Sequence, residues 1–204
     1  MLHTETVEPH TLELLRLLMR LPELDGFLLV GGTSLSLQIG HRISVDIDMF
    51  SIEKFDSERL LDILREQFEV GISDKSIRTL NLRLNGVKTD MLHYPYPLLQ
   101  PSLEVDGVRM ISRHDICAMK LGAISGRAEK KDFYDLYFLL KEFQFSEMLD
   151  FYQTKYSTDD IFHILKSVAY FAEADESPEP NMLEKVSWME VKRTIQREVR
   201  GYLK

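Results

Sequence analysis

The segment from Phe27 to Ser51, FLLVGGTSLSLQIGHRISVDIDMFS, contains the residues best suited to chemistry on a phosphate. Asp46 and Asp48 lie two residues apart in an alternating, strand-like stretch, so both carboxylates project from one face. Upstream, Gly31 and Gly32 follow an apolar strand and open a short helix. There the backbone can approach phosphates closely, and the first N–H groups of the helix face an anion. Clustered carboxylates beside such a turn are the parts needed to hold metal ions and a nucleoside triphosphate.

Asp90, in the strand-like segment VKTDML, is the natural third acid. If its strand pairs beside the strand of Asp46 and Asp48, the three carboxylates converge. Such a set suits Mg²⁺, which prefers hard oxygen ligands and completes its octahedron with substrate phosphates. Two ions roughly 4 Å apart can support an in-line displacement. Each feature alone is common on solvated strands and turns, so the ordered set carries the prediction of a metal-dependent nucleotidyl-transfer site.

The elements that must position these residues form an α/β front. Leucine spacing and turn signals predict helices over Thr11–Met19, Thr33–Ile39 and Asp56–Phe68, and strands over Gly26–Val30 and Ser44–Phe50. Asn85-Gly86 is a strong hairpin-turn signal and joins the expected strands Ile77–Leu84 and Val87–Leu92. A second hairpin is expected around Asp106-Gly107.

After Ser112 the pattern becomes helical. Helices are expected from Ser112 to about Ser125, and over Lys131–Phe143, Asp159–Phe171 and Ser187–Leu203, with an acidic loop over residues 173–180. The sequence therefore predicts an α/β part over residues 1–112 and a helical part over residues 113–204.

Composition narrows the class of protein. The chain has 204 residues with a single cysteine, Cys117, which excludes an internal disulfide and fits a reducing cytoplasm. No apolar run approaches 18 residues and the N-terminus lacks a signal-peptide pattern, so no membrane association is expected.

The distribution of charge is more informative than its total. The net charge of −8 argues against a generic DNA-coating protein. Residues 1–112 carry 11 Lys and Arg against 17 Asp and Glu (net −6), as expected of a part that holds cations. Basic clusters at Arg127–Lys131 and Lys192–Arg200 could face a polyanion, or they could be ordinary solvated helix faces.

Four segments in order, GGTSLSLQIGHRISVDIDMFS, VKTDMLHYPY, ISRHDICAMKLGAISGR and KKDFYDLYFLL, resemble the AbiEii/AbiGii toxin family of nucleotidyltransferases, within the DNA polymerase β-like superfamily. The resemblance implies an α+β fold, with a mixed sheet, flanking helices and a C-terminal helical bundle. It also implies a toxin component whose antitoxin is encoded nearby. The activity implied is transfer of a nucleoside monophosphate from a nucleoside triphosphate to an acceptor hydroxyl.

The resemblance assigns roles in the first part. Gly31, Gly32 and Thr33 form the phosphate-facing turn, Asp46 and Asp48 bind metal, and Asp90 is the third acid. Lys88 shares a face with Asp90 and could neutralise a phosphate. Arg42 and Ser44 match the family's turn before the acidic strand, where contact with the nucleotide and stabilisation of the turn are equally good interpretations.

In the helical part, Lys120 matches the lysine that contacts the triphosphate, and Lys131, Asp132 and Asp135 match a late motif that lines the active site. Lys120 could instead be a surface lysine, and Asp115 could simply cap its helix. Either Asp90 or Asp135 could accept the proton of the acceptor hydroxyl.

The mechanism expected uses two Mg²⁺ ions, with Mn²⁺ as an alternative, and the acceptor implied is RNA, with the 3′ end of tRNA as a candidate. Two alternatives stay open. One is a non-catalytic nucleotide- or RNA-binding module of the same fold, and the other is an enzyme that acts on a small-molecule or protein acceptor.

Overall fold

A mixed β-sheet organises the N-terminal part of the computed structural model, which describes residues 1–76 and 78–204. Within these residues the sheet has seven strands in the order β3-β4-β5-β2-β1-β7-β6. The strands are β1 (Phe27–Leu29), β2 (Ile47–Ser51), β3 (Val70–Ser76), β4 (Thr79–Leu84), β5 (Val87–His93), β6 (Leu103–Val105) and β7 (Val108–Met110). The central pair, β2 and β5, is parallel, whereas β5 runs antiparallel to β4.

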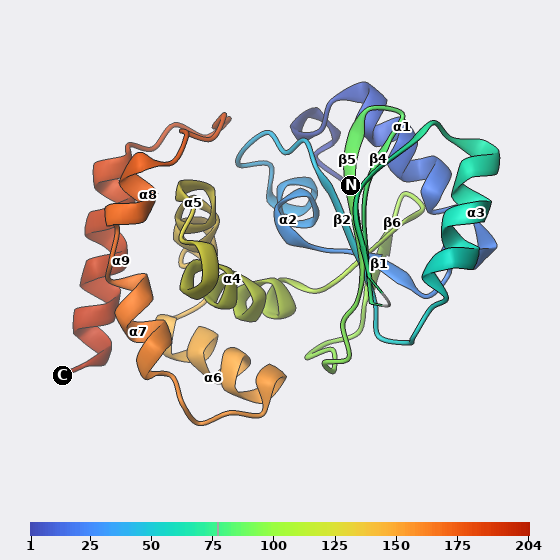
Figure 1. The fold of residues 1–204 in the computed structure, drawn as a ribbon. Coiled ribbons are helices and arrows are strands. Elements are labelled where there is room, and N and C mark those ends of the chain that lie inside the picture. Colours follow the sequence, from blue (N-terminus) through green and yellow to red (C-terminus); the bar gives the residue numbers. More distant parts are fainter. Residues whose placement is uncertain (77) are drawn as a thin grey trace. The chain divides into compact units, whose positions relative to one another are not determined.

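Helices cover both faces of this sheet. Figure 1 shows α1 (Pro9–Leu18) and α3 (Ser57–Gln67) on one side and α2 (Gly31–Ile39) on the other. The two short 3₁₀ helices are η1 (Thr4–Thr6) and η2 (Pro22–Leu24). Alternate β4 residues, Leu80, Leu82 and Leu84, are buried in one core with leucines of α1 and α3. The alternation in the sequence therefore marks the face that the helices cover.

The Asn85-Gly86 turn fixes the register of β4 on β5. Both residues have positive φ, 49° and 84°, as a type I′ turn requires. The expected hairpin is therefore present, with β4 beginning at Thr79; its expected first residue, Ile77, lies outside the described residues. The sequence missed β3, which pairs with β4 as an edge strand.

The C-terminal part is helical. Its helices are α4 (Arg113–Arg127), α5 (Lys130–Leu139), α6 (Phe145–Tyr156), α7 (Phe162–Val168), α8 (Ala172–Glu176) and α9 (Trp188–Tyr202). Three expectations were wrong here. Helix α6 was not predicted, the helix expected over Asp159–Phe171 is the shorter α7, and α8 extends over residues 173–176 of the segment expected as an acidic loop.

The mixed sheet with flanking helices, followed by a helical part, confirms the expected α+β fold. The described chain divides into two compact units. One comprises Met1–Pro97 with Pro101–Ile111, and the other comprises Ser112–Lys204 with Leu98–Gln100. That residues 1–112 and 113–204 are separate domains stays a prediction. Among the described helices, none has the length and apolarity needed to cross a membrane.

Candidate active site

The two glycines at the start of α2 are required by the side chains around them. Gly31 has φ = +67°, which other residues rarely adopt, and a Cβ there would lie 2.8 Å from Asp48 Oδ2. A Cβ on Gly32 would overlap the guanidinium of Arg42. The acidic strand and the glycine turn are therefore in close contact, as a site that brings carboxylates to a helix N-terminus requires.

Two of the three acids lie side by side on the central strands. Asp48 of β2 is in direct register with Asp90 of β5 in the parallel pair. Asp46 lies just before β2, two residues from Asp48. The strand pairing on which the expected convergence of acids depended is thus present, although β2 begins later than the predicted strand at Ser44.

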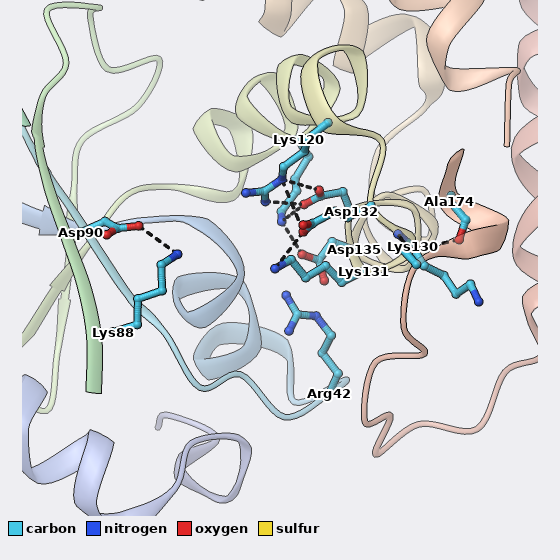
Figure 2. Close-up of polar contacts among 12 residues, drawn as sticks. Arg42, Lys88, Asp90, Lys120, Lys130, Lys131, Asp132, Asp135 and Ala174 are labelled. Carbon is cyan, nitrogen blue, oxygen red and sulfur yellow. Dashed lines mark hydrogen bonds and ion pairs between the residues drawn. The ribbon is translucent and has the colours of Figure 1, made fainter. Parts of the chain in front are cut away.

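Asp90 is held by two neighbouring side chains. Asn81 of β4, directly opposite Asp90, donates from Nδ2 to Asp90 Oδ1 at 2.8 Å. Lys88 Nζ lies 3.0 Å from Asp90 Oδ2 (Figure 2). The sequence interpretation missed Asn81, although the Asn85-Gly86 turn carried the signal: a two-residue hairpin places residue 81 across from residue 90.

The charges of all three acids act on Lys88. Burial lowers the pKa of the Lys88 ammonium. The hydrogen bond to Asp90 and the charges of Asp90, Asp46 and Asp48 more than offset this, so its pKa is raised overall. Lys88 is therefore a cation paired with Asp90, and the charges of Asp46 and Asp48 also favour its protonated form.

Thr33 and Ser44 join α2 to the segment that carries the acids. The Thr33 hydroxyl donates to the carbonyl oxygen of Asp46 and lies 2.8 Å from Ser44 Oγ. Both residues are buried, as is Arg42, whose Nη1 donates to the Ile43 carbonyl at 3.0 Å. These contacts show that Thr33 and Ser44 shape the turn; contact with a nucleotide stays a prediction.

The three acids fit a divalent cation that also binds substrate phosphates. Across the described residues, no group of three or more His, Cys, Asp and Glu side chains is arranged to hold a metal by itself. Mg²⁺ does not need such a cage, since it commonly uses one or two carboxylates with substrate phosphates and water. Asp48 and Asp90 supply hard oxygen donors in register, and Asp90 already holds the positive charge of the Lys88 ammonium. The donor set fits Mg²⁺.

In the helical unit, Lys120 forms a buried ion pair with two carboxylates. Its Nζ lies 2.7 Å from Asp132 Oδ1 and 2.5 Å from Asp135 Oδ2, and all three side chains are at most 4% exposed (Figure 2). Arg127 adds a second cation, 2.9 Å from Asp132 Oδ2. This network ties α4 to α5, so the interpretation of Lys120 as a surface lysine is wrong.

Two further residues of the late motifs have local partners. Lys131 Nζ lies 2.9 Å from Glu129 Oε2 and is 38% exposed. Asp115 accepts from Ser112 Oγ at 2.7 Å and pairs with Lys155 at 2.7 Å, with both side chains fully buried. Asp115 is thus a structural residue in the first turn of α4, but the cap of this helix is Ser112, so the interpretation that Asp115 caps it is wrong.

The chain is similar to known proteins over most of its length. The model of the family described as "Nucleotidyl transferase AbiEii toxin, Type IV TA system" matches residues 13–97 and 80–200. An uncharacterized protein of Aquifex aeolicus is 35% identical over 185 residues, which cover 88% of this chain and 89% of that protein.

Two solved structures share the fold. JHP933 from Helicobacter pylori matches with a TM-score of 0.52 at 17% identity, over 97% of this chain and 96% of its own. MenT4, a nucleotidyltransferase toxin from Mycobacterium tuberculosis H37Rv, matches with a TM-score of 0.53 at 16% identity, over 92% and 83% of the two chains. At such identities these likenesses establish the fold alone.

Proposed function

This chain belongs to the AbiEii family of nucleotidyltransferase toxins and is a nucleotidyltransferase, and on that premise we propose a metal-dependent reaction in which Asp46, Asp48 and Asp90 form the catalytic centre. The chain transfers a nucleoside monophosphate from a nucleoside triphosphate to an acceptor hydroxyl. The observation that carries this proposal is the register of Asp48 on Asp90, with the Gly31 turn in contact with Asp48.

Asp48 and Asp90, with Asp46, would hold two Mg²⁺ ions. When bound, the ions lower the charge on the phosphates and make the attacking hydroxyl a better nucleophile. The protein residues mainly position the reactants, as in most phosphoryl-transfer sites. Lys88, whose raised pKa keeps it protonated, neutralises charge on a phosphate beside Asp90.

The triphosphate binds where α2 begins. The N–H groups at the start of α2 are not used by its own helical hydrogen bonds, and the helix dipole favours an anion there. Gly31 and Gly32 allow the phosphates to approach the backbone. Thr33, Arg42 and Ser44 hold this turn against the acidic segment and extend its contacts to the nucleotide.

The late motifs of the family imply a second set of groups, which lie on α4 and α5. We propose that Lys120 contacts the triphosphate, with Lys131, Asp132 and Asp135 completing the nucleotide site, as the late motifs of the family imply. Asp132 and Asp135 orient the ammonium of Lys120 from two sides, and orientation is what a phosphate-binding lysine needs. Asp90 and Asp135 are the two candidates for accepting the proton of the acceptor hydroxyl.

The acceptor we propose is RNA, with the 3′ end of tRNA as the first candidate, and the physiological partner is a cognate antitoxin. The test is to incubate the protein with Mg²⁺, each of four α-labelled nucleoside triphosphates and total tRNA. We expect label on RNA with one preferred nucleotide, and loss of label in the Asp46→Ala/Asp48→Ala variant.

Asp62→Ala is the matched control, because Asp62 lies on α3 with its side chain 73% exposed. Label that persists in the double variant would refute the assignment of the acids. Transfer to no RNA, with intact nucleotide binding, would refute RNA as the acceptor, and absence of nucleotide binding would refute the mechanism.

A further inference from the structure

The sheet carries a basic pair beside the acids, Arg83 and Lys88, of which the proposed mechanism uses Lys88 alone. Arg83 of β4 is directly opposite Lys88 of β5, and Gly71 of β3 is opposite Arg83. Residues paired across antiparallel strands share a face, so these three positions form one row. The next row on the same face, two residues along each strand, includes Asn81 and Asp90. We call the face formed by these two rows the β4–β5 face.

The β4–β5 face is open to solvent. Leu80, Leu82 and Leu84, which point the opposite way from β4, are buried, whereas Arg83 is exposed and the side chain of Lys88 is 49% exposed. Gly71 adds no side chain next to Arg83, so the surface there is flat. A ligand can therefore lie across the strands at this row.

Arg83 is placed to receive an anion. Its Nη1 donates to the Gly86 carbonyl at 3.2 Å, and no carboxylate among the described residues pairs with it. Like charges directly opposite each other on an antiparallel pair repel. Asp90 already pairs with Lys88 at 3.0 Å, so the positive charge that an anion on this row would meet in addition is that of Arg83, and the row favours a negatively charged ligand.

The direction of the proposed reaction indicates which ligand would lie on this row. The strands follow one another as β4, β5, β2 and β1, about 4.8 Å apart, with the Gly31 turn leading from β1 into α2. In the proposed function the leaving pyrophosphate lies at that turn. The attacking oxygen must be in line on the other side of the acids. The acceptor therefore enters over β5 and β4.

We infer that the β4–β5 face binds the acceptor, that the acceptor is a polynucleotide strand, and that Arg83 with Lys88 holds a phosphodiester next to its reacting end. Two residues along a strand span about 6.6 Å, of the order of one nucleotide, which separates the phosphate at the basic row from the hydroxyl at the acids. This inference rests on the proposed function and adds Arg83 as a positioning residue for the acceptor.

The test compares Arg83→Ala and Arg83→Glu with Arg65→Ala and Arg65→Glu. Arg65 is on α3, 52% exposed, and serves as a matched arginine in the same unit. Binding of a fluorescein-labelled single-stranded RNA 12-mer and of total tRNA is followed by anisotropy over a series of KCl concentrations, without nucleoside triphosphate. Binding of the preferred nucleoside triphosphate with Mg²⁺ is measured separately by calorimetry.

We expect Arg83→Ala to weaken RNA binding up to about fivefold, the range of an exposed ion pair. It should also flatten the dependence of log affinity on log salt by about 0.7, the share of one phosphate contact on a single strand. Arg83→Glu should weaken binding further. The Arg65 variants should match the wild type, and nucleotide affinity should be unchanged in all four.

Unchanged RNA affinity and salt slope in both Arg83 variants would overturn the inference, and so would a loss confined to nucleotide binding. A wild-type protein that binds neither RNA would overturn it as well. If the Arg83 variants bind RNA as tightly as the wild type and still transfer label to it, the proposed function stands and the assignment of the β4–β5 face is refuted. Arg83-dependent RNA binding without any transfer supports the surface and refutes the proposed function.

Discussion

At the scale of single residues, the candidate site depends on the close approach of Gly31 and Asp48, which leaves no room for a side chain at position 31. The Asp48 carboxylate occupies the space beside Gly31 that a Cβ would need, and the backbone of Gly31 is in the left-handed region. The sequence predicted both residues from their types and order. It could not predict that they touch, because contact depends on how β1 and β2 pair.

Replacing Gly31 by alanine distinguishes a loss of stability caused by backbone strain from a loss of activity caused by displacement of Asp48. Gly31→Ala should cost about 1–2 kcal/mol of stability, the penalty of a left-handed residue with a Cβ, and should displace Asp48. Gly107→Ala is the control, since Gly107 has φ = +75° with no atom within 4 Å of its Cβ position. We expect similar losses in the free energy of unfolding but a loss of transfer activity, at least tenfold, in Gly31→Ala alone. Equal activity in the two variants would contradict the proposed contact.

The buried acid Asp132 should make the free energy of unfolding fall as the pH is lowered. Burial raises the pKa of Asp132, but Lys120 and Arg127 lower it by more, so the folded value is below the usual range. The ionised Asp132 carboxylate therefore stabilises the folded state. This stabilisation is complete above the unfolded pKa of about 3.9 and is lost as pH falls through the lowered folded pKa.

Urea unfolding of the wild type and Asp132→Asn between about pH 7 and pH 3 measures this. The difference in free energy of unfolding should stay constant down to about pH 5 and shrink below about pH 4. A difference that grows on acidification would show that the pKa is raised in the folded state. The exposed Asp62→Asn should show little difference at any pH.

At the scale of elements, local signals predicted the parts of the fold that local chemistry determines. The Asn85-Gly86 turn specified a hairpin, and the helices expected to begin at Ser112 and Ser187 are capped by these serines, each accepting the N–H three residues on. By contrast, β3 is exposed at every residue after Val70, and its second half, from Ser73 to Ser76, is polar throughout, so no sustained alternating pattern marks it; pairing with β4 makes it a strand.

Helix α6 escaped prediction for a related reason. Its N-cap is Gln144, with Glu147 reaching back to the backbone, and glutamine is not among the usual cap residues. In the candidate site too, some features follow from local sequence and others only from tertiary packing. The spacing of the glycines and acids predicted them as site residues, whereas the pairing of Lys120 with Asp132 and Asp135 depends on how α4 packs on α5.

The buried pair Asp115–Lys155 tests how α4 and α6 are joined. Both side chains are fully buried, and Asp115 also accepts the N–H of Leu99 at 3.0 Å. Lys155→Met leaves the carboxylate without a compensating charge and should cost about 3–5 kcal/mol in denaturant unfolding. Lys166→Met, at an exposed position of α7, should stay within about 0.5 kcal/mol of the wild type. A loss for Lys155→Met as small as that of the control would show that the pair is not a structural tie.

At the scale of the whole molecule, the chain joins an acidic sheet unit to a helical unit. The only tryptophan, Trp188, lies in the helical unit and packs on Phe133, Tyr134 and Phe171. Its fluorescence therefore reports on that unit, whereas far-UV circular dichroism reports on both.

If the two units are separate domains, urea unfolding followed by Trp188 fluorescence and by circular dichroism should give different midpoints. Coincident transitions would show one cooperative unit and contradict the division into domains. Phe143→Trp, in the same unit, is a control that should follow the Trp188 transition.

The central claim is that Asp48 and Asp90, brought into register by β2 and β5, form the catalytic centre of a nucleotidyltransferase. The most direct measurement is the rate of pyrophosphate release with the preferred nucleoside triphosphate, Mg²⁺ and RNA for the wild type, Asp48→Asn, Asp90→Asn and the exposed control Asp62→Asn. Removal of one charged group from such a site should lower kcat about 10²–10³-fold in the first two variants and leave the control unchanged. Rates within a few-fold of the wild type in folded Asp48→Asn or Asp90→Asn would contradict the account.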